Sequence, residues 1–327
     1  MDLSPLGLVV GHATDDAGAT GVTVLRGAAS PMRAGVAVIG RATGSRELRT
    51  ASADHLVNGR VDAIMLTGGS AYGLDAAAGV MRWMEEHERG FDVGGGVVPI
   101  VPAAVVFDLA PLGQFGARPT AEMAYRATND ATSLVVEGCV GVGTGATVGK
   151  IFGAAGAMKT GFGCGIVTSG DGEVTVAAMV VVNAFGDVRN GGGEIIAGAR
   201  TPAGGFADTA RTLNHGDVAS PAKFDEAALR NTTLAVVASS APLSSTELAR
   251  VAGAASGALF KRITPVGTSF DGDVIFAVSP EHGARARLAP LIIESLAVSA
   301  LETAIERAAT LAHGRDGIPG YADGNGH

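Results

Sequence analysis

A candidate nucleophile stands where a charged, helix-like run ends and an apolar one begins, in "RNTTLAVV". The Thr232 hydroxyl could attack the carbonyl of Asn231, form an ester by an N→O acyl shift, and free a new chain end when water hydrolyses that ester. The released α-amino group has an ordinary pKa near 7.7–8.0, so it could serve as general base for its own hydroxyl. Thr232 would then supply both nucleophile and base.

Two simpler interpretations of Asn231-Thr232-Thr233 stay open. Threonine is common in strands, so the segment could be an ordinary strand start. It is also formally an Asn-x-Thr glycosylation acceptor. The first residues, "MDLSPLGLVVGHATDD", lack the basic and long apolar regions of a signal peptide, which disfavours glycosylation and leads us to expect a cytoplasmic protein.

Two carboxylates and one amide could support such a nucleophile. Asp271 and Asp273 in "SFDGDVIFAVS" are two residues apart before an apolar run, so an extended backbone would point both side chains to one face. An Asp-Gly turn is the competing interpretation. Asn183 ends the apolar run "VVVN", where its amide could cap a turn or donate to an oxyanion.

The glycine-rich segment "GCVGVGTGATVGK" ends at Lys150. A phosphate-binding P-loop needs glycine at the position of Thr144 and Ser or Thr at that of Ile151, so the motif fails twice. The segment could still bring backbone N–H groups and Lys150 to a reacting carbonyl, or Lys150 could be a solvated loop lysine.

Serine and metal chemistry have weaker support. Ser70 in "LTGGSAYGLD" resembles a nucleophile elbow, but Tyr72 occupies the position that needs glycine, so we expect Ser70 to cap a helix. No two of the seven histidines have metal-ligand spacing, so neither a metal nor another cofactor is expected.

The composition predicts a globular α/β protein that could position these residues. Of 327 residues 47% are hydrophobic and 17% charged, and 49 are glycine. The net charge of −8 without a basic cluster argues against nucleic-acid or membrane-surface partners, and no uncharged apolar run reaches the roughly 18 residues of a membrane span. Cys139 and Cys164 are expected to be buried free thiols.

Hydrophobic periodicity predicts strands and helices in layers. Helices are expected over 70–90, 244–262 and 288–314, and "SGDGEV" at 169–174 predicts a hairpin. The segment 191–230 is expected to be a loop with a short helix, and the last seven residues a frayed tail. The predicted strands lie at 35–39, 61–66, 97–106, 133–136, 165–168, 174–182, 232–238 and 274–278.

Six motifs in order resemble the L-aminopeptidase/D-esterase peptidases and the related nylon-oligomer (6-aminohexanoate-oligomer) hydrolases. They are "GATGVTV", "LTGGSAYGLDAAAGV", "GATVGK", "VVVNAFG", "NTTLAVVAS" and "FDGDVIFAV". The resemblance covers nearly the whole chain. It implies a four-layer αββα sandwich of the ornithine acetyltransferase type, similar to N-terminal-nucleophile hydrolases. It also implies self-cleavage of one catalytic domain into fragments 1–231 and 232–327 that stay together, usually as a tetramer of such pairs.

The resemblance also implies a role for each candidate residue. Thr232 becomes the new N-terminal nucleophile, with Lys150 and Asn183 around the nucleophile and oxyanion. Asp271 and Asp273 match the family's acidic pair, which we expect to neutralise Lys150 and hold the Thr232 ammonium.

Phe107 and Tyr72 are the expected substrate-binding residues. Phe107 stands where the nylon-hydrolase branch has tyrosine, so the phenolic hydroxyl is lost. The expected activity is hydrolysis of small peptides or amide oligomers. An acyltransferase of the ornithine acetyltransferase type and a non-catalytic oligomeric homologue are the alternatives.

Overall fold

Two large sheets form the centre of the protein. The computed structural model describes residues 1–216, 231–283 and 289–324. Its five-stranded sheet has the order β1-β2-β6-β9-β4 and its six-stranded sheet the order β12-β13-β16-β18-β3-β5. The strands of the first sheet, in that order, are Leu8–Asp15, Thr20–Gly27, Ala63–Thr67, Ala103–Val105 and Ser45–Arg46. Those of the second are Phe162–Thr168, Thr175–Asn183, Thr232–Ser239, Val274–Pro280, Met32–Val38 and Arg60–Val61.

Short strands and helices surround these sheets. The short strands are β7 (Phe91–Asp92), β8 (Val97–Val98), β10 (Thr147–Val148), β11 (Met158–Lys159), β14 (Asp187–Arg189), β15 (Ile195–Ala197) and β17 (Ile263–Thr264). The helices are α1 (Ala77–Glu86), α2 (Ala121–Asn129), α3 (Thr209–His215), α5 (Ser245–Arg262) and α6 (Pro290–Thr310). The 3₁₀ turns are η1 (Ser4–Leu6), η2 (Leu48–Ala51), η3 (Ser70–Ala76), η4 (Gly141–Gly143), η5 (Lys150–Phe152) and η6 (Tyr321–Asp323).

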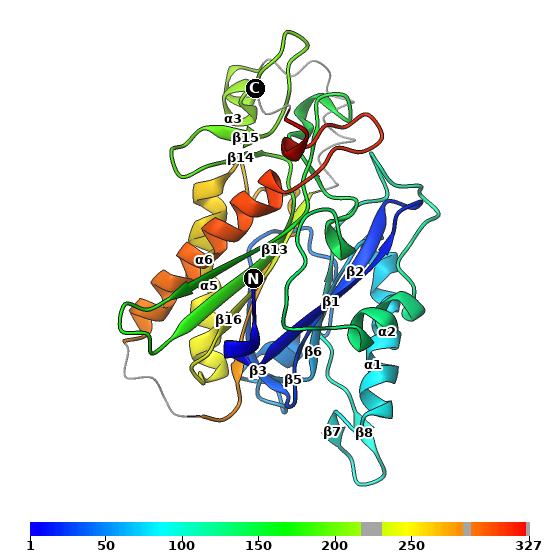
Figure 1. Ribbon diagram of the computed structural model, residues 1–327, viewed down its shortest axis with the longest axis vertical. Helices are drawn as coiled ribbons and strands as arrows, with labels where there is room; N and C mark the ends of the chain where they lie inside the picture. The colour runs from blue at the N-terminus through cyan, green and yellow to red at the C-terminus, as the bar shows by residue number, and fades with distance from the viewer. Residues whose placement is uncertain (217–230, 284–288, 325–327) are drawn as a thin grey trace.

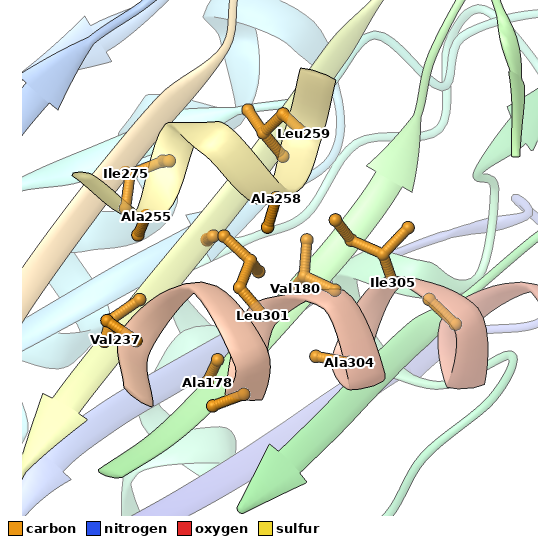
Figure 2. Close-up of a cluster of buried hydrophobic side chains, with 14 of the residues drawn as sticks. Ala178, Val180, Val237, Ala255, Ala258, Leu259, Ile275, Leu301, Ala304 and Ile305 are labelled. Carbon is orange, nitrogen blue, oxygen red and sulfur yellow. The ribbon is translucent and has the colours of Figure 1, made fainter. Parts of the chain in front are cut away.

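Helix α5 and helix α6 pack side by side on one face of the six-stranded sheet (Figure 1). Figure 2 shows their small and branched side chains meeting those of β13, β16 and β18. Close approach depends on small residues, because a Cβ on Gly165 of β12 would lie 2.2 Å from the carbonyl oxygen of Ala300 in α6. The other face of this sheet packs on the five-stranded sheet, and α1 and α2 cover the far face of the five-stranded sheet.

Alternation along β13 explains why this strand is apolar almost throughout. Ala178 and Val180 point to the helices, whereas Met179 and Val181 point to the other sheet. Both faces are therefore buried, and successive side chains of a strand point to opposite faces. Side chains of β16 alternate in the same way. Because a slip by one residue would move every side chain to the other face, this burial fixes how β16 pairs with its neighbours, including at its first residue. A mixed α/β fold, as predicted, is confirmed.

Several predicted elements are confirmed. The 169–174 segment joins β12 to β13 as an antiparallel hairpin. Helix α5 begins with a capping box, in which Ser244 Oγ accepts from the Glu247 N–H and the Glu247 carboxylate accepts from the Ser244 N–H. Cys139 and Cys164 are both free, but only Cys164 is buried.

Other predictions were wrong. The chain over 133–136 forms only an isolated bridge at Leu134, and prolines split 97–106 into β8 and β9. The hairpin of β1 and β2 was not predicted. The 70–90 segment begins as η3 rather than as an α-helix. Ser70 does not cap it, because Gly69 is the N-cap and Ser70 itself has a φ of +52°.

The chain ends also differ from expectation. Asp323 is not in a frayed tail, since its carboxylate accepts from the N–H groups of Gly314 and Gly320. Within 191–230, the predicted short helix is confirmed as α3, whereas the short strand β15 lies where a loop was expected. Residues 217–230 of this segment, residue 288 of the predicted last helix and residues 325–327 of the predicted tail lie outside the described ranges. Among the described residues, no helix is long and apolar enough to cross a membrane.

Candidate active site

The candidate nucleophile is the first residue of a central strand. Strand β16 begins at Thr232 and lies between β13, which runs antiparallel to it, and β18, which runs parallel. Thr232 pairs with Asn183, the last residue of β13. The preceding residue, Asn231, forms a parallel bridge with Asp271, just before β18 begins. Three segments far apart in sequence therefore meet at one end of the sheet.

The peptide bond between Asn231 and Thr232 is enclosed by hydrogen bonds. Thr232 Oγ1 donates to the Asn231 carbonyl oxygen at 2.6 Å, and the Gly272 N–H donates to the same oxygen at 3.0 Å. Asn231 and Thr232 are only 3% and 6% exposed. The hydroxyl thus lies directly beside the carbonyl that self-cleavage would attack.

Lys150 is buried rather than solvated. Its ammonium donates to the side-chain Oδ1 of Asn183 at 2.8 Å and to the main-chain oxygen of Asn183 at 3.2 Å. Lys150 begins η5 directly after Gly149, whose φ is +67° and whose added Cβ would lie 2.1 Å from the backbone nitrogen of Ala199. This glycine is required because L side chains are strained at that φ and because the backbones approach closely.

Asn183 links four segments through one amide. Besides Lys150, its Oδ1 accepts from the Thr147 N–H at 3.1 Å, and its Nδ2 donates to the Phe107 carbonyl oxygen at 3.0 Å. These three partners agree with one orientation of the amide. The donor that the sequence suggested for an oxyanion contacts the Phe107 backbone in this state of the chain.

The acidic pair is held by backbone donors. Asp271 accepts from the Thr268 N–H at 2.7 Å, and Asp273 accepts from the N–H groups of Thr233 at 2.6 Å and Gly267 at 3.3 Å. Both carboxylates therefore bind backbone N–H groups of the same turn, at Gly267 and Thr268. Burial, together with the neighbouring charge of Asp271, raises the pKa of Asp273 to about 7.

The two expected substrate-binding residues lie in different surroundings. Phe107 is half-buried, and its carbonyl oxygen joins the site through Asn183. Tyr72 is 54% exposed on η3, with the guanidinium of Arg118 3.5 Å from its ring centre. Among the described residues, the hydrogen bonds that join Thr232, Asn183 and the acidic pair do not include Tyr72.

The weaker candidates gain no support from the structure. Ser70 takes up its left-handed backbone conformation while donating its N–H to the Val106 carbonyl oxygen. His313 is exposed and contacts Asp323 rather than a serine. Within the described part of the chain, no cluster of three His, Cys, Asp or Glu side chains could hold a metal ion.

Sequence reasoning missed three contributors, and all three act through backbone N–H groups. These are Gly272 on the Asn231 carbonyl oxygen, Thr233 on Asp273 and Thr147 on Asn183. Of these three, only Gly272 stands out in the sequence, because it is the glycine between the two aspartates. The arrangement combines a hydroxyl, an adjacent carbonyl, a buried cation and an acidic pair, which suits acyl transfer through a hydroxyl.

Known proteins are similar to this chain in sequence and in fold. The sequence model of peptidase family S58 matches residues 6–318. An uncharacterized aminopeptidase of Mycobacterium tuberculosis is 39% identical over 288 residues, which cover 80% of this chain and 78% of that protein. The 6-aminohexanoate-oligomer endohydrolase of a Kocuria species is 28% identical over 285 residues, covering 84% and 74%.

Two solved structures have the same fold at 21% identity. The β-aminopeptidase of a Burkholderia species has a TM-score of 0.69 and coverage of 96% of this chain and 88% of that one. The L-aminopeptidase D-Ala-esterase/amidase of Ochrobactrum anthropi, described as a variant of the Ntn-hydrolase fold, has a TM-score of 0.66 and coverage of 94% and 85%. The chain belongs to peptidase family S58 and is a hydrolase of peptide or amide bonds.

Proposed function

We propose that the chain cleaves itself between Asn231 and Thr232 and then hydrolyses small peptides or amide oligomers through an acyl-Thr232 intermediate. The observation that carries this proposal is the Thr232 hydroxyl, buried and 2.6 Å from the carbonyl oxygen of the residue before it. Cleavage there yields fragments 1–231 and 232–327 of one catalytic domain.

Cleavage would convert Thr232 into a complete catalytic unit. Its new α-amino group has an ordinary pKa close to neutral pH, so it can take the proton of the Thr232 hydroxyl as that hydroxyl attacks a substrate carbonyl. The leaving amine departs, and water then hydrolyses the ester. The acyl group of the substrate takes the place that the acyl group of Asn231 has in the uncut chain.

The surrounding residues have assigned roles in this proposal. Lys150 and Asn183 form one polar unit opposite Thr232 in the sheet, where they orient the nucleophile and balance developing charge. Asp271 and Asp273 hold the new ammonium group and offset the charge of Lys150. Phe107 and Tyr72 contact the substrate, with Phe107 close to the nucleophile through its bond to Asn183.

The architecture and assembly belong to the same proposal. Packing of α5 and α6, two sheets, and α1 and α2 supports an αββα sandwich of the ornithine acetyltransferase type. We infer that the cleaved pairs form a tetramer in the cytoplasm. Sedimentation of the purified protein tests the assembly, and a single species at the mass of one chain would contradict it.

Intact mass under denaturing conditions tests self-cleavage. Purified protein should give two polypeptides, the smaller one beginning at Thr232 by N-terminal sequencing. Thr232→Ala should leave one full-length chain and abolish amide hydrolysis. Thr168→Ala is the matched control, since it removes a threonine hydroxyl from the exposed end of β12 and should process normally.

The reaction class needs its own measurement. A small amide substrate should release its acyl group as the free acid, even when an amine acceptor is added. Transfer to the amine that outpaces hydrolysis would favour an acyltransferase instead. A full-length chain that hydrolyses amides as well as the cleaved protein would contradict the role of Thr232.

A further inference from the structure

The carbonyl at the proposed cut accepts a second hydrogen bond, from the backbone. Besides the Thr232 hydroxyl, the Asn231 carbonyl oxygen accepts the Gly272 N–H at 3.0 Å. An oxyanion donor lies 2.7–3.1 Å from the position that the charged oxygen occupies in the transition state, rather than from the ground-state carbonyl oxygen. The contact in the uncut chain therefore places the Gly272 N–H beside the oxygen before the charge develops. Gly272 lies between Asp271 and Asp273, but this contact joins two main-chain groups and involves neither carboxylate.

We propose that the Gly272 N–H is the oxyanion donor of the self-cleavage reaction; the inference rests on the proposed cleavage before Thr232. Thr232 Oγ bonds to the Asn231 carbonyl carbon, and the carbonyl oxygen gains negative charge beside the Gly272 N–H. The C–N bond then breaks, and the nitrogen of Thr232 gains the hydroxyl proton. Water hydrolyses the resulting ester, which leaves a carboxylate on Asn231 and restores the hydroxyl.

Burial makes this backbone donor effective. The Asn231–Thr232 peptide is almost fully shielded from water, so the growing charge on its oxygen has little solvation. A fixed N–H in such a site stabilises the charge without reorganising during the reaction. Removal of one oxyanion donor in other enzymes slows the reaction about 10²–10³-fold.

Other contacts hold the donor in place. On the N-terminal side of Gly272, the main-chain carbonyl oxygen of Asp271 accepts the N–H of Ala42, in the segment after β3, at 3.0 Å. On the C-terminal side, the main-chain carbonyl oxygen of Asp273 accepts the N–H of Gly40 at 3.1 Å. Gly272 is therefore fixed on both sides.

Only glycine fits at this position. A Cβ on Gly272 would lie 2.7 Å from Thr232 Oγ1 and 2.9 Å from the Ala42 carbonyl oxygen. Any side chain would therefore displace the nucleophile or the supporting backbone. The absence of a side chain lets the N–H come close to the Asn231 carbonyl while the hydroxyl keeps its place.

An ester in place of one backbone amide tests the donor. Glycolic acid incorporated at position 272 by cell-free translation replaces the N–H with an ester oxygen and adds no side chain, although it also weakens the Asp271 carbonyl as the acceptor of the Ala42 N–H. We expect the precursor to fold and to cleave about 10²–10³-fold more slowly than the unmodified chain, measured from the two fragments on a denaturing gel over time.

The matched control removes an N–H from the neighbouring segment that follows β3. Glycolic acid at position 40 deletes one of the two hydrogen bonds to the Asp273 main-chain oxygen, which keeps the Ile39 N–H at 2.9 Å, and leaves the Asn231 carbonyl untouched. This chain should lose comparable thermal stability and cleave at close to the normal rate. Equal cleavage rates for the two ester-containing chains would overturn the role of Gly272.

Hydrogen exchange supplies a measurement that needs no change at Gly272. In Thr232→Ala, which keeps the uncut bond, the Gly272 N–H should exchange slowly because it is bonded to a buried carbonyl. Exchange at the rate of an open loop would overturn the inference even if the ester-containing chain failed to fold. If the unmodified protein is never cleaved before Thr232, the proposed function itself fails.

Discussion

Asn183 and Thr232 are partners in the antiparallel ladder of β13 and β16, at the last residue of one strand and the first residue of the other. This pairing brings the Asn183 amide, with its bound lysine, to the end of the sheet where the candidate nucleophile begins. The pairing has consequences that can be measured on the intact protein.

Replacement of Asn183 by leucine should both destabilise the protein and stop its processing. The change leaves the Thr147 N–H, the Phe107 carbonyl and the Lys150 ammonium without their amide partner in a buried site. Each such loss costs about 1–3 kcal/mol, so the melting temperature should fall by several degrees. Asn183→Asp keeps both contacts to Oδ1 and should lose less stability. Equal melting temperatures for the two variants would contradict this account.

Two buried lysines should respond differently to replacement by methionine. Lys150→Met removes the cation bound to Asn183 and should slow self-cleavage by 10²-fold or more. Lys159 is also fully buried, and its ammonium donates to the carbonyl oxygens of Gly143 and Thr160. Lys159→Met should cost about 1–3 kcal/mol of stability but leave the cleavage rate of folded protein unchanged. Gel time courses and thermal melts separate these effects, and similar cleavage rates would argue against a role for Lys150.

Stability of the uncut chain should fall as the pH rises through about 7. The pKa of Asp273 is raised from its ordinary value to about 7 by burial, then by the charge of Asp271. Between about pH 4 and pH 7 the folded state therefore keeps a proton on Asp273 that the unfolded state has lost. The contribution of protonated Asp273 to stability is fully present below about pH 4 and is lost as the pH rises through about 7. Thr232→Ala provides uncut protein for melts between pH 4 and 8. The double variant with Asp273→Asn should lose this part of the pH dependence, and an identical profile would contradict the raised pKa.

Phe107→Tyr should change substrate turnover with little effect on folding. Phe107 is half-buried, and its carbonyl oxygen accepts from the Asn183 side chain. The nylon-oligomer hydrolases that the chain resembles have tyrosine at this position. The added hydroxyl should lower KM for amide oligomers by a few-fold, since it provides one more hydrogen bond to the substrate. Phe91→Tyr, at an exposed phenylalanine of β7, is the matched control and should leave KM unchanged. An unaltered KM in Phe107→Tyr would remove this residue from the substrate site.

The sequence alone supplied the residue types and much of the local structure. Burial on both faces makes the middle of β13 and of β16 apolar, and Ser244 and Glu247 have the spacing of a helix cap. Such signals are local, so they can be read without knowing which segments meet. The prediction of a strand over 133–136 was wrong because tertiary contacts leave only an isolated bridge there. The prediction of a helix cap at Ser70 was wrong because Ser70 has a left-handed backbone.

Tertiary structure decided how the chemistry is assembled. Lys150 could be read as a solvated loop residue until Asn183, 33 positions later, was seen to bind its ammonium. The donor at Gly272 has no side-chain signature, because a backbone N–H is present at nearly every position and its direction depends on the fold. Pairing of β16 with both β13 and β18 sets these distances, and no local pattern encodes a register between segments so far apart.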